Sequence, residues 1–147
     1  MFPCYTCGDA AGQVTAAVNN LQTNNANYNT FWLDIEGGTQ YWSATKSSNQ
    51  NFFIGLVNQA KSMRQKIGVY TSSNDWSVIM GNTYTAGSTY PLWYPHYQST
   101  PDPSFNDFVP FAGWYSPFMK QYIGDSTICS TGLDVNWLPA ANFTESF

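Results

Sequence analysis

Short apolar segments alternate with amphipathic segments along this chain, and that alternation limits the fold more than any other feature. Residues 10–21 and 53–60 carry apolar side chains at helical spacing, and a third helix is expected over residues 74–80, capped by Ser72 or Ser73. Strands are expected at residues 1–6, 31–37, 67–72, 91–97, 118–125 and 133–139. Six strands interleaved with helices predict a single α/β domain over residues 1–147.

The composition favours a carbohydrate ligand and argues against several other classes of partner. Charged residues make up only 10% of the chain, the net charge is −4, and the basic residues are scattered singly. This leaves no cationic surface for nucleic acid or an anionic membrane. No apolar run approaches the roughly 18 residues that a membrane span requires. Aromatic residues reach 18%, and such rings stack well on sugars.

The segment FWLDIEG, residues 31–37, places two carboxylates at the end of an apolar strand. Residues i and i+2 of a strand share a face, so Asp34 and Glu36 point the same way with their backbones about 6.5–7 Å apart. At that range in a poorly hydrated site one pKa rises, which leaves one acid and one anion, as glycoside hydrolysis requires. Glu36 has the longer reach and is our candidate acid. The alternative is a strand that simply ends in polar residues.

A second candidate strand, GLDVNWLP, carries Asp134 and Asn136 on one face. Taken alone, this pattern favours a strand with a solvated edge over a functional site. Active sites of α/β folds lie at the carboxyl ends of parallel strands, and the position of Asp34 and Glu36 fits that rule.

Five segments together resemble a known enzyme family. FWLDIEG, IGVYTSSNDW, LWYPHY, PFAGWYSPFMKQYIGD and GLDVNWLP occur in the order found in glycoside hydrolase family 25, the lysozymes of the Chalaropsis type, especially its protist and nematode members. The resemblance covers nearly the whole chain. It implies an irregular (β/α) TIM-like barrel that cleaves the β-1,4 bond between N-acetylmuramic acid and N-acetylglucosamine in peptidoglycan, without a cofactor or a metal.

The resemblance also implies roles for individual residues. Glu36 would be the general acid, with Asp34 beside it and Asp134 as a further catalytic carboxylate. Tyr70 and Trp93 would line the sugar groove, although packed core aromatics are an alternative for both, and Asn136 is a candidate substrate-binding residue. The first two strands of the family's barrel, with an active-site Asp, precede the segment that MFPCYTC resembles. We therefore expect an N-terminally truncated barrel with about six strands.

The three cysteines raise a rival interpretation. Cys4 and Cys7 form a C-x-x-C before a predicted helix, which suits either a structural disulfide or a dithiol oxidoreductase. Cys129 then needs a partner, which we expect within this set or in a segment outside this chain. A zinc site from these cysteines and His96 is formally possible, but we expect His96 to be a hydrogen-bonded rim residue instead.

The expected setting is outside the cytosol. Asn142-Phe143-Thr144 is an N-glycosylation acceptor, and a pI of about 4.5 suits an acidic digestive compartment. We expect a monomer, either secreted or lysosomal and phagosomal, that acts on bacterial peptidoglycan and has antibacterial activity. The alternative functions are a saccharide-binding relative without turnover and, less favoured, the dithiol oxidoreductase.

Overall fold

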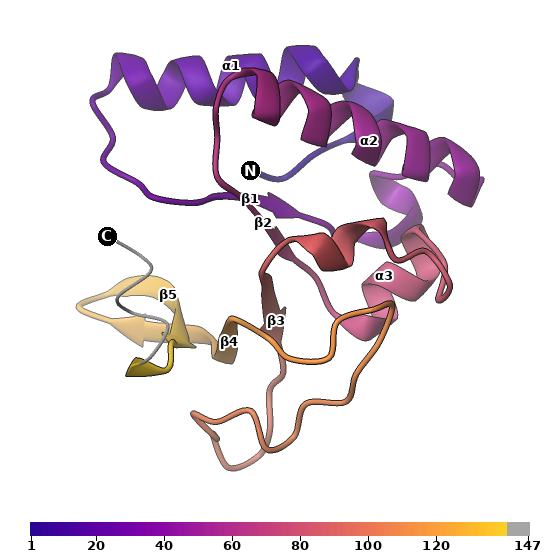
Figure 1. The fold of residues 1–147 in the computed structure, drawn as a ribbon. Helices are drawn as coiled ribbons and strands as arrows, with labels where there is room; N and C mark the ends of the chain where they lie inside the picture. Colours follow the sequence, from indigo (N-terminus) through magenta and orange to yellow (C-terminus); the bar gives the residue numbers. More distant parts are fainter. Residues whose placement is uncertain (141–147) are drawn as a thin grey trace.

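One sheet forms the framework of the molecule, which is described here from a computed structural model for residues 1–140 (Figure 1). The described strands are β1 (Phe31–Asp34), β2 (Ile67–Tyr70), β3 (Leu92–Pro95), β4 (Met119–Ile128) and β5 (Thr131–Trp137). They lie in the order β1-β2-β3-β4-β5, with parallel pairing from β1 to β4 and an antiparallel β4–β5 hairpin. The predicted α/β class is confirmed, and the curled sheet resembles part of a (β/α) barrel.

The predicted opening strand is wrong. Tyr5–Cys7 form a short 3-10 helix, and only Met1 pairs with β1, through its ammonium to the Trp32 carbonyl (2.8 Å) and its carbonyl to the Asp34 N–H (2.9 Å). Pro3 has no N–H to continue such a ladder. The side chain of Gln13 then binds both the N–H and the carbonyl of Cys4, at 2.9 and 2.7 Å, and turns the chain toward the first helix.

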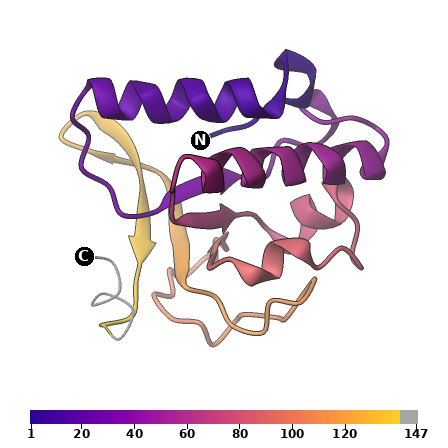
Figure 2. The same cartoon turned by 45° about the horizontal axis from the view of Figure 1, so that its top comes forward.

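Three helices cover the sheet where the sequence predicts them. They are α1 (Ala10–Thr23), α2 (Lys46–Ser62) and α3 (Ser73–Ile79), and α1 and α2 lie side by side on one face of the sheet (Figure 2). The Ser72 hydroxyl accepts the N–H of Asp75 at 2.9 Å, so Ser72 is the cap of α3. None of the helices in residues 1–140 combines the length and apolar character needed to cross a bilayer.

Successive side chains of β1 point alternately to the helix-covered face of the sheet and to its other face. Phe31 and Leu33 of β1 are buried against the apolar faces of α1 and α2, whereas Trp32 and Asp34 point the other way and are only partly buried. The burial of β1 thus fits a strand that is apolar toward the helices and polar toward the far side.

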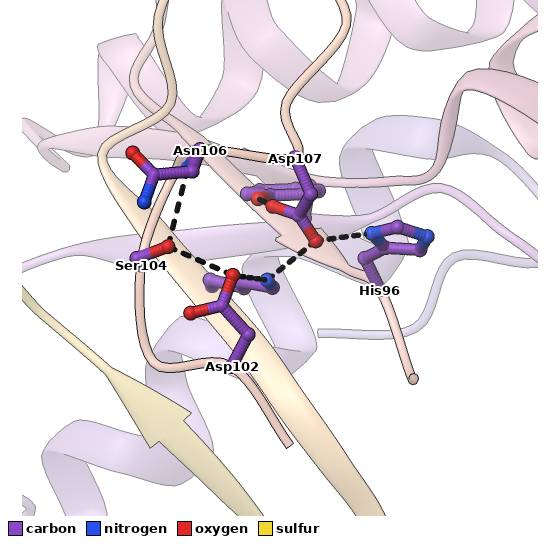
Figure 3. A network of polar contacts seen from close by, with 7 residues as sticks. His96, Asp102, Ser104, Asn106 and Asp107 are labelled. Atoms are coloured by element: carbon purple, nitrogen blue, oxygen red, sulfur yellow. Dashed lines mark hydrogen bonds and ion pairs between the residues drawn. The ribbon is translucent and has the colours of Figure 1, made fainter. Parts of the chain in front are cut away.

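A buried lysine ties the long segment between β3 and β4 to the sheet. Lys120 of β4 is completely buried, and its Nζ lies 2.6 Å from Asp107 Oδ2 and 4.0 Å from Asp102 (Figure 3). Asp107 also accepts the Tyr94 hydroxyl at 2.8 Å and contacts His96 Nδ1. Burial alone would raise the pKa of Asp107, but the hydrogen bonds from Lys120, Tyr94 and His96 lower it to about 2.

His96 was expected to be hydrogen-bonded, and its partner in the structure is Asp107. The predicted acceptor Asn142-Phe143-Thr144 lies outside the described residues.

We predict that Lys120→Met destabilises the fold because it leaves the Asp107 carboxylate buried without its ammonium partner. Urea denaturation should show a loss of roughly 3 kcal/mol in the free energy of unfolding. The matched variant Lys46→Met, at an exposed residue of α2, should change it by less than about 0.5 kcal/mol. Equal effects of the two variants would contradict the structural role of the Lys120 cluster.

Candidate functional site

A cavity of about 240 Å³ opens where the parallel strands end. Parallel pairing brings the carboxyl ends of β1, β2 and β3 to the same edge of the sheet, beside the first residues of β4, and β5 adds one more wall. The cavity is lined by Met1, Trp32, Asp34, Glu36, Tyr70, Trp93, Gln121 and Asp134. Five of the six residues predicted for catalysis or substrate binding are therefore brought together, although they are spread over a hundred residues of sequence.

Asp34 is partly buried in this site. Its Oδ1 is buried and has no hydrogen-bond partner among the described residues. Burial, together with the nearby negative charges of Glu36 and Asp75, raises the pKa of Asp34 to about 7 against the opposing effect of the Met1 ammonium. Near neutral pH this carboxyl thus holds its proton about half of the time.

Glu36 follows β1 and shares the cavity with Asp34. Burial raises its pKa, and the negative charges of Asp75 and Asp134 add to the effect. The sequence argument assigned the raised pKa to Glu36, whereas the structure gives a large upward shift to Asp34 as well. Two carboxyls this close titrate as a pair, so together they retain a proton in mildly acidic solution.

Asp134 occupies the opposite wall and is held by two donors. Its Oδ2 accepts Gln121 Nε2 at 3.1 Å, and its Oδ1 accepts the Asp125 N–H at 3.0 Å. Both carboxylate oxygens therefore act as acceptors, which fixes the orientation of the side chain. The site combines a proton-holding pair on β1 with a hydrogen-bonded carboxylate on β5.

The aromatic wall is built from mutually packed rings. Trp93 lies edge-to-face against Tyr70, with centroids 4.8 Å apart, and against Trp32 at 5.6 Å. Asn136 does not line the cavity; its Oδ1 instead accepts Trp93 Nε1 at 2.9 Å. In this structure Asn136 therefore orients the Trp93 ring and does not face the cavity itself.

Four residues of the site were missed from the sequence. Met1, Trp32 and Gln121 line the cavity, and Asp75 acts on both acidic residues through its charge. A signal existed for Gln121, because a glutamine in a predicted strand needs hydrogen-bond partners wherever it is buried. Asp75 carried no such signal, since its position near the first turn of α3 looks like ordinary helix capping.

The cysteines do not contribute to the cavity lining. Cys4 and Cys7 form a disulfide just before α1, and Cys129 is free and exposed between β4 and β5. The zinc site considered from the sequence is therefore not assembled, because two of its ligands are joined and His96 binds Asp107. Within the described 140 residues, no three His, Cys, Asp or Glu side chains are grouped so that they could hold a metal ion.

Comparison with known proteins decides the family. The family model "Lysozyme-like protein 1" matches residues 1–122. The chain belongs to the family 25 lysozyme-like glycoside hydrolases. It is 52% identical to "Probable GH family 25 lysozyme 2" and 45% identical to "Probable GH family 25 lysozyme 4", both of Dictyostelium discoideum, over 139 residues in each case. Each alignment covers 95% of this chain and 63% of the relative, so this family 25 chain spans about three fifths of those proteins.

The fold of the family 25 chain also matches a solved structure. A muramidase from Acremonium alcalophilum superposes with a TM-score of 0.70 at 21% identity, over 95% of this chain and 65% of that one. At this identity the likeness concerns the fold, and it bears out the barrel architecture expected from the sequence.

We predict that Asp34→Asn stabilises the protein in a pH-dependent way. The raised pKa means that the folded state loses stability as pH rises from about 4, where unfolded Asp ionises, to about 7, where folded Asp34 ionises. The amide removes that cost, so the variant should gain roughly 1–3 kcal/mol at pH 8 and almost nothing at pH 4. Urea denaturation at both pH values tests this. A gain that does not grow with pH would contradict the burial of an ionising Asp34.

Proposed function

We propose that the cavity is a lysozyme-type glycosidase site that hydrolyses the β-1,4 bond between N-acetylmuramic acid and N-acetylglucosamine in peptidoglycan. The observation that carries this proposal is the union of a proton-holding pair, Asp34 and Glu36, with a hydrogen-bonded carboxylate, Asp134, in one aromatic-walled cavity. Glycoside hydrolysis needs an acid and an anion on either side of the scissile bond. Membership of family 25 supports the same reaction class.

In this proposal Glu36 is the general acid. Its side chain is longer than that of Asp34, and it is less deeply placed than a carboxyl whose Oδ1 is fully buried. The Glu36 proton passes to the glycosidic oxygen as the bond from that oxygen to the anomeric carbon breaks. Water then adds to the anomeric carbon and returns a proton to the Glu36 carboxylate.

The anionic side of the cavity stabilises the positive charge that develops on the sugar. Asp134 supplies a fixed carboxylate, and Asp34 adds charge to the extent that it is ionised. The N-acetyl group of the substrate can assist by attacking the anomeric carbon, in which case these carboxylates stabilise the cyclised intermediate. Tyr70 and Trp93 offer flat faces to the sugar rings.

The raised pKa values favour work in acid. The Glu36 carboxyl must be protonated to donate, so activity should fall as pH rises through its pKa. We propose an acidic digestive compartment, reached by a secretory or lysosomal route, as the working site, with the protein acting as a monomer on bacterial walls. An activity maximum above neutrality would contradict this part of the proposal.

Turnover distinguishes the enzyme from the two alternatives. A saccharide-binding relative would retain wall fragments without releasing reducing ends. The oxidoreductase alternative is less well supported, because Cys4 and Cys7 lie outside the aromatic and acidic cavity and the fold is that of muramidases.

We predict that Glu36→Gln lowers the release of reducing ends from purified peptidoglycan at about pH 4.5 by at least ~100-fold, because the amide cannot donate the required proton. The matched control Asp9→Asn also removes one carboxylate but keeps a side-chain cap at the start of α1, and it should retain full activity. Undiminished turnover by the Glu36→Gln variant would overturn the assignment of the acid. Saccharide binding without turnover by the unmodified protein would support the binding alternative.

A further inference from the structure

The side chain of Gln121 forms hydrogen bonds with three other side chains at the cavity. Gln121 is the third residue of β4, only 5% exposed, and its side chain contacts Tyr70, Tyr97 and Asp134. Its backbone is held on both sides, since it pairs with Pro95 of β3 and with Asn136 of β5. A buried polar side chain with a fixed backbone has few ways to satisfy its hydrogen bonds.

The amide of Gln121 has one workable orientation. Its Oε1 accepts the Tyr70 hydroxyl at 2.7 Å and also the Tyr97 hydroxyl, while its Nε2 donates to Asp134 Oδ2 at 3.1 Å. Turning the amide over would place its oxygen against the carboxylate oxygen of Asp134. An ionised carboxylate only accepts hydrogen bonds, so that arrangement would leave two acceptors facing each other. Asp134 thus selects the orientation of the amide, and the two hydroxyls donate to its oxygen in that orientation.

Asp134 depends on this donor for one of its two hydrogen bonds. The other comes from the Asp125 N–H, in the irregular part of β4 where the pairing with β5 shifts register. A backbone N–H from an irregular strand orients one oxygen only. The second oxygen is directed by Gln121, whose own position is set by the two tyrosines.

Tyr97 is itself held from outside the cavity. The preceding residue, His96, contacts Asp107 through its ring, and its backbone N–H donates to the Gln121 carbonyl at 2.9 Å. The contacts of Lys120 and His96 with Asp107 (Figure 3) therefore lie beside those of Gln121. Lys120 precedes Gln121 in β4, and His96 precedes Tyr97 after β3. Lys120 and Gln121 are adjacent in β4, so their side chains point to opposite faces of the sheet.

We propose that Gln121 is a positioning residue that keeps the Asp134 carboxylate aimed into the cavity shared with Asp34 and Glu36 throughout the reaction. The inference rests on the proposed glycosidase function and assigns a role that neither the sequence motifs nor the family likeness supplies. The negative charge of Asp134 then stays in place while the β1 pair loses and regains its proton. Tyr70 and Tyr97 act through Gln121, because their hydroxyls fix its amide.

The first test replaces the amide by a carboxyl of the same size. In Gln121→Glu the new side chain can still accept from the two tyrosines, but it can donate to Asp134 only when protonated. At neutral pH kcat should fall roughly 10- to 100-fold while KM changes much less, since a charge-assisted hydrogen bond that orients a reacting group is lost. The ratio of variant to unmodified activity should rise as pH falls, because protonation restores the donor.

Gln22→Glu is the matched control for this test. It introduces the same charge at an exposed residue of α1 that does not line the cavity, and its activity ratio should stay near one at every pH. A Gln121→Glu ratio that does not change with pH, or an effect on KM alone, would overturn the positioning role.

A second readout does not depend on turnover. In nitrogen-15 NMR spectra of the uniformly labelled chain, the Gln121 side-chain amide proton that faces Asp134 should move clearly in Asp134→Asn and stay in place in Asp9→Asn. An unchanged Gln121 signal would overturn the proposal even if the enzyme is active. If the chain shows no turnover but this signal moves, the proposed reaction fails while the contact between Gln121 and Asp134 stands.

Discussion

Parallel pairing from β1 to β4 is the constraint on which the site depends. It brings the carboxyl ends of β1, β2 and β3 and the first residues of β4 to the same edge of the sheet, so side chains from these positions meet there. The period of two then decides which side chains face the cavity: Leu33 and Ile35 go to the helices, while Asp34 and Glu36 go to the other side. A register slip of one residue would exchange these two sets and destroy both core and cavity.

The chain uses its few charges in two opposite ways. Around Lys120, each buried charge has a partner, and the pKa of Asp107 is lowered accordingly. In the cavity, burial and, after it, neighbouring negative charges raise the pKa values of Asp34 and Glu36. The ion pairs around Lys120 stabilise the fold. The repulsion between the cavity carboxylates is unfavourable, but it raises pKa values at the place where the proposed reaction needs a proton donor.

Elements that depend on local pattern were predictable from the sequence, and those that depend on distant partners were not. The helical spacing of residues 10–21 and the cap at Ser72 are local, and both appear in the structure. The opening strand failed because Pro3 and the side chain of Gln13 divert the chain, and Gln13 lies outside the predicted strand.

The site follows the same division. Asp34 and Glu36 could be found from their spacing at a strand end, and the family motifs added Asp134, Tyr70 and Trp93. The role of Gln121 needs the register between β4 and its neighbours, which no local pattern contains. Asn136 was placed on the correct strand, but its contact with Trp93 Nε1 directs it to the support of the wall.

The central claim is that the cavity between β1 and β5 receives the sugar whose bond is cleaved. The most direct measurement is a crystal structure of the Glu36→Gln variant with a bound peptidoglycan disaccharide unit. Our account predicts the glycosidic oxygen within hydrogen-bonding distance of the substituted side chain at position 36, the sugar ring against Trp93 or Tyr70, and Asp134 on the opposite side. A saccharide bound elsewhere on the molecule, with this cavity empty, would contradict it.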